Sequence, residues 1–312
     1  MLSRSLLLIS ILSITFVHSK KNVNNRPIIG ILAQSTKGTS VESLGQTYID
    51  AAYVKYVESS GGRVVPIKNN LSHDELSNLF NSINGVLFPG GDVDVVDSGY
   101  AKTGEIIVKL AKKAFDKGDY FPLWGTCLGF QFLATAVSGT SSILSSSDAE
   151  NLALPLDFSR GYKESRMFSS MSSKLAKYLS TASTTVNLHR NCVTTESFDG
   201  NMKLKQFFRV LSTNYDRNQK HFVSTMEGIK YPFYATQWHP EKNSFEWTKA
   251  LKIPHEAMSI EVTQYFSNFF INETRSNNHK FKSIEEQEKN MMYNYCPIFT
   301  GNISNWVQTY II

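Results

Sequence analysis

The chain has 312 residues, of which 41% are hydrophobic and 19% charged, a composition typical of a soluble globular protein with a sizeable core. Its net charge of +5 is spread along the chain without a long Lys/Arg block, which argues against nucleic-acid binding. The three cysteines are an odd number, so at least one thiol is unpaired and a disulfide scaffold is excluded.

The N-terminus has the features of a secretory signal peptide, which we place at residues 1–19. Arg4 precedes an apolar run from Leu6 to Val17, and small and polar residues follow it. This run is too short to indicate a membrane span, and no later segment is long and apolar enough to cross a bilayer. Three acceptor tripeptides for N-glycosylation also favour export, at Asn70, Asn272 and Asn302. We therefore expect a mature protein that is soluble in the secretory pathway and free of membrane.

The first half of the chain alternates between strand-like and helical patterns. Apolar, β-rich runs predict strands at 26–33, 63–67, 84–91 and 120–125. Helical spacing follows each of them, at 47–62, 72–83, 101–118 and just after Cys127. This alternation predicts an α/β fold with a mainly parallel central sheet flanked by helices on both faces. Ligands bind such sheets at the carboxyl ends of the strands, where "PGGD" and "GTCLG" both fall.

The second half is less regular. The Ser/Thr-rich segment 139–200 has weak periodicity, and we interpret it as loops with short elements. Strand-like runs then follow at 208–214, 221–228 and 231–240, and helical patterns at 257–275 and 283–295. The apolar tail 307–312 is expected to pack against the body. Without an internal repeat or a long linker, one catalytic domain over 26–312 is the simplest interpretation.

The segment Gly125-Thr126-Cys127-Leu128-Gly129 has the spacing of a nucleophile elbow with sulfur in place of oxygen. Small neighbours allow the sharp turn from strand to helix, and the N-terminus of the helix favours a thiolate. The amide of Leu128 can then contribute to an oxyanion hole. A buried structural cysteine is the alternative for this pattern alone. A disulfide between Cys192 and Cys296 also stays open.

A candidate base lies about a hundred residues downstream, in "YATQWHPEK". His239 and Glu241 are two residues apart at the end of a predicted strand, so their side chains are expected to point the same way. Glu241 can orient the imidazole while its other nitrogen serves the thiol of Cys127. A polar surface turn is the alternative. The order also differs from that of α/β-hydrolases, in which the acid precedes the histidine.

These motifs carry a resemblance. "GTCLGFQ" followed by "WHPE" is similar to class I glutamine amidotransferase domains, and "FPGGDVD", "PLWGTCLGF", "STMEGIKYPFYATQWHPEK" and "FTGNIS" resemble the gamma-glutamyl hydrolase family of that superfamily. The similarity runs from about Pro27 to the C-terminus and implies a flavodoxin-like fold. It also implies that Cys127 is the nucleophile, His239 the base and acid, and Glu241 the third member of a triad.

The resemblance assigns further residues. Gly91 matches the strand-end glycine whose amide joins that of Leu128 in the oxyanion hole. His189 falls where the hydrolases have a functional histidine, with a surface histidine as the alternative. Gln131 matches a substrate-holding glutamine of the amidotransferases, although the hydrolases differ at this position.

The function implied is hydrolysis of γ-glutamyl bonds, those of folate poly-γ-glutamates in particular, through a glutamyl thioester. This chemistry requires no metal and no organic cofactor. The resemblance also implies a secreted or lysosomal location and a possible homodimer. Two alternatives stay open: a glutaminase or amidotransferase subunit acting with a separate synthetase, which the signal peptide argues against, and a binding protein without turnover, which the intact Cys–His–Glu set argues against.

Overall fold

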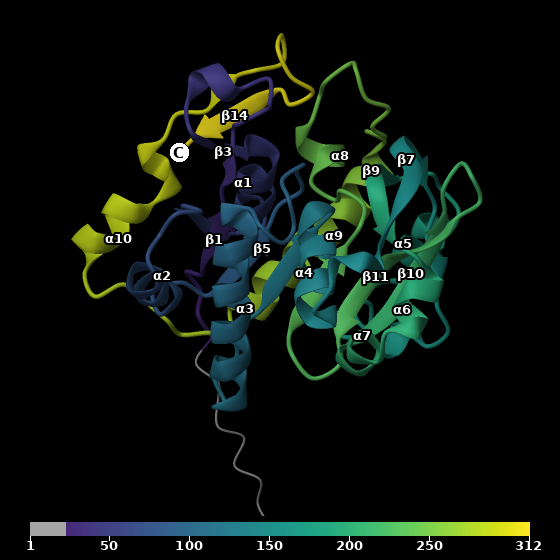
Figure 1. Ribbon diagram of the computed structural model, residues 1–312, viewed down its shortest axis with the longest axis horizontal. Helices are drawn as coiled ribbons and strands as arrows, with labels where there is room; N and C mark the ends of the chain where they lie inside the picture. Colours follow the sequence, from purple (N-terminus) through teal and green to yellow (C-terminus); the bar gives the residue numbers. More distant parts are fainter. Residues whose placement is uncertain (1–22) are drawn as a thin grey trace, which may run out of the picture.

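An eight-stranded sheet runs through the centre of the protein, as the computed structural model shows for residues 23–312 (Figure 1). The predicted signal peptide lies outside these described residues. In spatial order the strands are β4 (Arg63–Ile67), β1 (Ile28–Leu32), β5 (Gly85–Phe88), β6 (Leu123–Thr126), β12 (Phe233–Thr236), β11 (His221–Gly228), β10 (Phe208–Tyr215) and β8 (Asp157–Phe158).

The two ends of this sheet differ in strand direction. From β4 to β12 neighbouring strands are parallel, whereas β11, β10 and β8 pair in antiparallel fashion. The predicted mainly parallel sheet is therefore confirmed, with an antiparallel extension at one edge. The strands β5 and β6 are direct neighbours, so the loops after them open at the same edge of the sheet.

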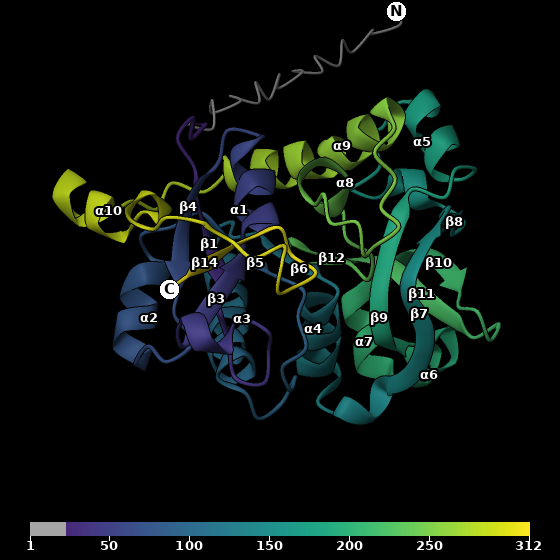
Figure 2. The same cartoon turned by 90° about the horizontal axis from the view of Figure 1, so that it is seen from above.

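Helices cover both faces of the sheet, which Figure 2 shows from above. One core cluster joins the sheet to α2 (His73–Phe80), α3 (Gly99–Asp116), α4 (Leu128–Ser138), α6 (Thr195–Gly200) and α7 (Met202–Phe207). The other joins it to α1 (Ala51–Glu58), α5 (Ser173–Leu179) and α9 (Ala257–Thr274). Such two-sided burial explains why the parallel strands are continuous apolar runs.

Two smaller sheets complete the fold. Four short strands pair in the order β13 (Ile298–Phe299), β14 (Gln308–Ile311), β3 (Thr47–Asp50) and β2 (Gln34–Ser35). A separate antiparallel ribbon consists of β7 (Leu144–Leu154) and β9 (Thr185–Val193). Two short helices, α8 (Lys242–Phe245) and α10 (Ile284–Asn290), and four 3₁₀ turns lie between these elements; the turns are η1 (Glu42–Leu44), η2 (Ser141–Ile143), η3 (Tyr162–Glu164) and η4 (Met292–Asn294).

Several local predictions are confirmed. Ser72 and Glu75 form the expected reciprocal capping box at the start of α2. The tail does pack against the body, where Thr309 pairs with Asp50 across β14 and β3. The predicted helix at 257–275 is α9. No helix within residues 23–312 has the length and apolarity needed to cross a membrane.

Three predictions of secondary structure were wrong. Residues 47–50 begin the predicted helix as strand β3, because they pair with β14 from the far end of the chain. The predicted helix at 283–295 ends at Asn290, since Met291 is extended. Most important, segment 139–200 contains the long ribbon β7–β9. Register shifts at Ser146/Ala149 and Ala149/Leu152 interrupt its alternation, so the sequence lacks the two-residue period of a strand.

Candidate active site

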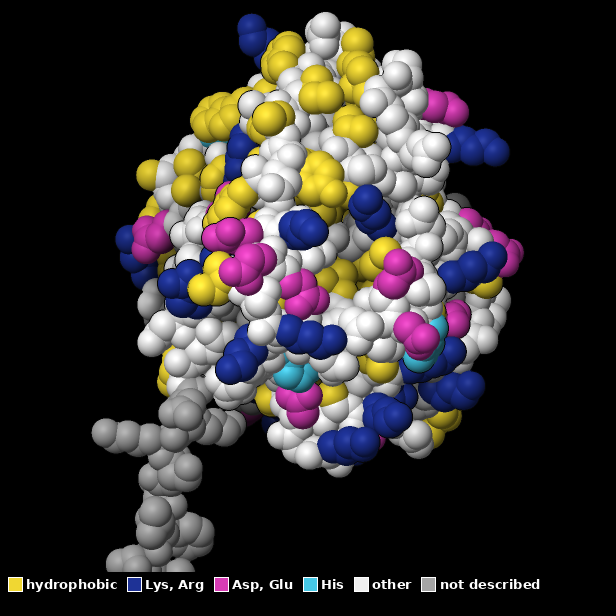
Figure 3. All heavy atoms as spheres, turned by 90° about the vertical axis from the view of Figure 1, so that its left-hand side faces the viewer, with side chains coloured by type: hydrophobic (Ala, Val, Ile, Leu, Met, Phe, Trp, Pro, Cys, Tyr) yellow, Lys and Arg dark blue, Asp and Glu magenta, His cyan; other side chains and the backbone are white. Residues whose placement is uncertain are grey.

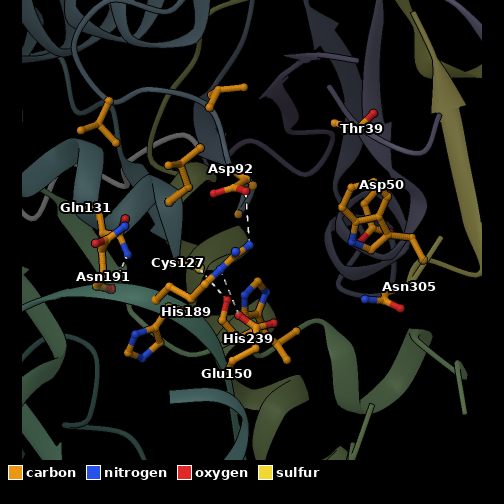
Figure 4. Close-up of a pocket in the computed structure, with 18 of the residues that line it drawn as sticks. Thr39, Asp50, Asp92, Cys127, Gln131, Glu150, His189, Asn191, His239 and Asn305 are labelled. Carbon is orange, nitrogen blue, oxygen red and sulfur yellow. Dashed lines mark hydrogen bonds and ion pairs between the residues drawn. The ribbon is translucent and has the colours of Figure 1, made fainter. Parts of the chain in front are cut away.

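A cavity of about 530 Å³ opens at the edge of the sheet where β5 and β6 end. The loops after these strands line it together with residues 188–191 of β9 and the histidine that follows β12 (Figure 4). Each wall therefore comes from a different part of the chain. The predicted nucleophile, Cys127, and the predicted base, His239, both lie in this cavity.

Cys127 has the strained backbone of a nucleophile elbow, with φ of 52° and ψ of −102°. Both flanking glycines are required. A Cβ atom at Gly125 would lie 2.6 Å from the carbonyl oxygen of Gly129, and one at Gly129 would collide with the carbonyl oxygen of Phe88. The close contact between β5, β6 and the start of α4 thus explains the G-x-C-x-G pattern.

The surroundings of the Cys127 thiol favour a reactive group. It is a free thiol, only 4% exposed, and it precedes the first residue of α4, Leu128. Its Sγ lies 3.8 Å from the carbonyl oxygen of Leu188 in β9. Its backbone is fixed by a 2.8 Å hydrogen bond that its amide donates to Thr236, the last residue of β12. The N-terminus of α4 therefore begins beside the sulfur, where the helix dipole stabilises negative charge.

His239 lies next to Cys127 (Figure 4). A Cβ atom placed on Gly90 would lie 2.6 Å from His239 Cε1 and 3.2 Å from Cys127 Cβ, so both side chains flank the same backbone position. The imidazole Nδ1 lies 2.7 Å from Glu241 Oε1 and 3.3 Å from the hydroxyl of Tyr53. Its Nε2 is buried and has no hydrogen-bond partner within the described chain. One ring nitrogen is thus held by the carboxylate while the other is available for chemistry.

His239 and Glu241 do meet, but the prediction that they do so as alternate residues of a strand was wrong. Strand β12 ends at Thr236, and Glu241 has helical dihedral angles of −75° and −22° as the residue preceding α8. The two side chains therefore meet across a tight turn and not along an extended strand. Pro240 between them has no amide hydrogen, which suits such a turn.

The charges of His239 and Glu241 stabilise each other. Burial disfavours the imidazolium, but the carboxylate of Glu241 and the thiolate form of Cys127 outweigh it and raise the pKa of His239 to about 10. Burial also opposes ionisation of Glu241, yet the His239 imidazolium and the Lys242 ammonium bring its pKa below the usual value. The His239 imidazolium and the Glu241 carboxylate therefore form a charged pair beside the Cys127 sulfur.

The backbone amides of Gly91 and Leu128, the two predicted donors of an oxyanion hole, have no acceptor within residues 23–312. By contrast, the Gly90 amide donates to the Tyr53 hydroxyl at 2.7 Å. Gln34 donates from Nε2 to the Gly90 carbonyl at 2.6 Å, and its buried amide covers Gly91 so closely that no Cβ would fit there. These contacts fix the loop that presents the Gly91 amide.

Sequence reasoning did not single out Tyr53, Gln34 or the buried ion cluster beside the site. In that cluster Lys242 contacts Asp50 and lies 3.4 Å from Glu246, and all three side chains are buried. Pattern analysis identified helical spacing around Tyr53 but had no means to place its hydroxyl. The lysine directly after the H-x-E motif was the one available sign of the cluster.

The two remaining predicted site residues lie on the cavity wall. His189 in β9 is buried; burial, aided by the charge of His239, lowers its pKa to about 3, so it stays neutral. Its Nε2 lies 3.2 Å from Asn187 Oδ1. Gln131 in α4 donates from Nε2 to the Asn191 carbonyl at 2.7 Å, which ties α4 to β9. His189 is therefore buried and not a surface histidine.

The other cysteines are free thiols, Cys192 buried and Cys296 exposed, which answers the open question of a disulfide between them. Within residues 23–312 no three acidic, histidine or cysteine side chains are grouped as a metal site. The predicted glycosylation acceptors, Asn70, Asn272 and Asn302, are all exposed.

Known proteins resemble this chain over most of its length. The model of the family "Peptidase C26" matches residues 27–241. The gamma-glutamyl hydrolase of Homo sapiens is 46% identical over 286 residues, covering 92% of this chain and 89% of that protein. Gamma-glutamyl hydrolase B of Dictyostelium discoideum is 41% identical, covering 93% and 84%. Gamma-glutamyl hydrolase 1 of Arabidopsis thaliana is 36% identical, covering 90% and 80%.

A solved structure shares the fold. The glutaminase domain of Trypanosoma brucei CTPS with bound acivicin superposes with a TM-score of 0.51 at 14% sequence identity, covering 81% of this chain and 95% of that domain. The predicted class I glutamine amidotransferase-like fold is thereby confirmed.

Proposed function

Because the chain belongs to the peptidase C26 family and is similar to gamma-glutamyl hydrolases along more than nine-tenths of its length, we propose that its cavity hydrolyses γ-glutamyl bonds through a thioester on Cys127. The observation that carries the proposal is the free Cys127 thiol on a strained elbow beside the Glu241-bound imidazole of His239. This arrangement joins a nucleophile, a proton carrier and a group that orients it.

The reaction begins with the sulfur. The thiolate of Cys127 attacks the γ-carbonyl carbon, and the amides of Gly91 and Leu128 donate hydrogen bonds that stabilise the negative charge developing on the carbonyl oxygen. The C–N bond then breaks as the His239 imidazolium protonates the departing amine. A water molecule, deprotonated by the now neutral His239, attacks the thioester. Its collapse releases the γ-carboxylic acid, whose proton passes to the released amine in solution, and restores the thiolate–imidazolium pair, so protons and charges balance.

We propose folate poly-γ-glutamates as the substrates. Each γ-linked glutamate presents the same electrophile, a carbonyl at the γ position, while its leaving group is an amine of an amino acid. The cavity volume of about 530 Å³ is large enough for more than one such unit. The support for this finer substrate is the sequence resemblance together with the size of the cavity.

The test is mass spectrometry of the products from a defined series of folate poly-γ-glutamates and from γ-glutamylglutamate. We expect the wild-type protein to shorten each chain at γ bonds, and Cys127→Ala to lower turnover by about 10⁴-fold or more with the fold retained. A thioester-trapping reagent or rapid acid quench should reveal a glutamyl adduct on the peptide that contains Cys127. Substantial turnover by Cys127→Ala would refute the assignment of the nucleophile.

We further propose that the protein is exported and glycosylated in a secretory compartment, the extracellular space or the lysosome. The N-terminal sequence and the exposure of the three acceptor asparagines support this location. Expression in a secretory cell followed by glycosidase digestion tests it. We expect a drop in apparent mass, which should vanish when the three acceptors are replaced by glutamine.

We also propose a homodimer. Several apolar side chains of the C-terminal segment are exposed, namely Ile284, Tyr293, Phe299 and Ile303. Figure 3 shows the face that carries this segment, with hydrophobic side chains gathered toward its upper part. Such patches on soluble proteins are typical of interfaces. Sedimentation of the wild-type protein and of Phe299→Lys tests this proposal, with a shift to monomer expected for the variant.

A further inference from the structure

An arginine and two carboxylates meet at the mouth of the cavity. Arg190 lies in β9, two residues beyond Leu188, whose carbonyl contacts the Cys127 sulfur. Its Nη2 is 3.4 Å from Asp92 Oδ2, and its Nε is 3.9 Å from Glu150 Oε2. In Figure 4 Asp92 lies above and Glu150 below the pair of Cys127 and His239. The guanidinium therefore bridges two walls of the cavity close to the sulfur.

Arg190 differs from every other cation of the cavity. Its side chain is 73% exposed, whereas Lys242, the other lysine or arginine that lines the cavity in the described chain, is buried against two carboxylates. The exposed acids at the mouth are Asp92, Asp94 and Glu150. A chain of γ-linked glutamates carries an α-carboxylate on each unit. Without Arg190 this mouth would repel such a ligand.

The present partners of Arg190 hold it weakly. Both ion pairs are longer than the 2.7–2.9 Å typical of charge-assisted hydrogen bonds, and the two nitrogens of one guanidinium edge, Nε and Nη2, are divided between two different carboxylates. Solvent-exposed pairs of this kind contribute little to stability. One ligand carboxylate that meets the guanidinium with both oxygens would form a better geometry than either pair.

From this placement we infer that Arg190 is a substrate-binding residue: it exchanges Asp92 and Glu150 for an α-carboxylate of the γ-glutamyl chain. The inference rests on the proposed function, because it takes the γ-glutamyl chain as ligand. The carboxylate belongs either to the glutamate attacked by Cys127 or to the one that leaves. Both are separated from the scissile bond by only a short stretch of carbon atoms, so the guanidinium can reach either from the cavity mouth.

A binding measurement separates this inference from turnover. In the Cys127→Ala background, titration calorimetry with γ-glutamylglutamate should give a Kd about 10- to 100-fold higher once Arg190→Gln is added. Asp92→Asn should shift the Kd several-fold in the opposite direction, because it removes both a competitor for Arg190 and a repelling charge. Arg160→Gln, which replaces an exposed arginine outside the lining of this cavity, is the matched control and should leave the Kd unchanged.

Two analogues identify which carboxylate is bound. In one analogue a carboxamide replaces the α-carboxylate of the acyl-side glutamate, and in the other it replaces that of the leaving glutamate. The analogue that lacks the carboxylate bound by Arg190 should bind the Arg190→Gln variant and its parent with equal Kd. An Arg190→Gln variant that equals Arg160→Gln with every ligand would overturn the inference, as would equal losses with both analogues. Tight, Arg190-dependent binding by a wild-type protein that cleaves nothing would sink the proposed function instead.

Discussion

The parallel half of the central sheet and the β7–β9 ribbon contribute to the same cavity in different ways. At the carboxyl ends of β5, β6 and β12 the backbone itself forms the site: the strained Cys127, the amides of Gly91 and Leu128, and the turn that carries His239. The ribbon adds the opposite wall, with side chains such as His189, Arg190 and Glu150. In the proposed reaction the parallel half therefore supplies the chemical groups, and the ribbon shapes the space in front of them.

This difference suggests how variants will behave. The parallel half should tolerate few substitutions, because its glycines pack against neighbouring backbone and its charged groups are buried in pairs. Strands β7 and β9 pair with each other in a sheet separate from the central one, and the charged side chains of Arg190 and Glu150 at the cavity are exposed. Substitutions in the parallel half should therefore lower kcat or stability, whereas substitutions in the ribbon should act mainly on KM.

The largest effect is expected from His239. His239→Gln removes both the proton carrier and the positive partner of the thiolate, so kcat/KM should fall by about 10³- to 10⁴-fold or more. KM should change far less, because the ligand-binding wall is intact. Steady-state kinetics with γ-glutamylglutamate, together with the alkylation rate of Cys127, give the two readouts. A loss confined to KM would contradict the division between the two regions.

We also expect His239→Gln to change how the free energy of unfolding depends on pH. The folded pKa of His239, about 10, exceeds the ordinary histidine value of 6.5, so the imidazolium stabilises the fold fully below about pH 6.5. This contribution is lost as the pH rises from 6.5 through 10. The free energy of unfolding should thus decline more steeply over this range for the wild type than for His239→Gln. Urea titrations at several pH values measure the difference, and parallel slopes would refute the assigned ion pair.

The sequence predicts those parts of the fold and site that leave a pattern in consecutive residues. Apolar runs with helical spacing between them predicted β1, β4, β5 and β6, because burial on both faces leaves a strong local pattern. The elbow was predictable since its glycines and its cysteine fall within five consecutive residues, although the contact that requires Gly129 is with Phe88 of the neighbouring strand.

The ribbon was not predictable in this way. Its strands β7 and β9 pair across some thirty residues with register shifts between them, and β7 fully buries only Ala149, so no local period reports the ribbon. The same holds for Tyr53, Asp50 and Gln34, whose roles depend on contacts with residues far away in the chain. Long-range side-chain partners leave no mark in a single sequence.

Lys242 should carry the next largest effect, on stability. Lys242→Met strands the buried carboxylates of Asp50 and Glu246, which should cost about 3–5 kcal/mol of unfolding free energy. The deficit should shrink at low pH, where the stranded carboxylates accept protons. Adding Asp50→Asn removes one stranded charge and should restore part of the loss. Chemical denaturation of the three proteins measures this, and an unchanged midpoint for Lys242→Met would show that the cluster is not stabilising.

Gly129→Ala tests the backbone contact behind the nucleophile. The added methyl group would collide with the carbonyl oxygen of Phe88, so α4 must shift away from β5. We expect a loss of about 1–3 kcal/mol in stability and a fall in kcat, because the Leu128 amide moves with the helix. Gly200→Ala is the matched control, since a Cβ there meets no atom within 4 Å. Equal behaviour of the two variants would argue against a tightly packed elbow.

The smallest effect is expected in the ribbon, at His189. Its imidazole is buried against Phe222, with ring centroids 5.0 Å apart, and its pKa of about 3 keeps it neutral across the range in which the enzyme is assayed. His189→Gln should therefore raise KM by about tenfold or less, because the cavity wall loses the imidazole ring and its hydrogen bond. The pH profile of kcat between pH 4 and 8 should stay unchanged, because this ring does not titrate there. A shifted profile would mean that His189 exchanges protons during the reaction, and the ribbon would then belong to the chemical machinery and not only to the wall facing it.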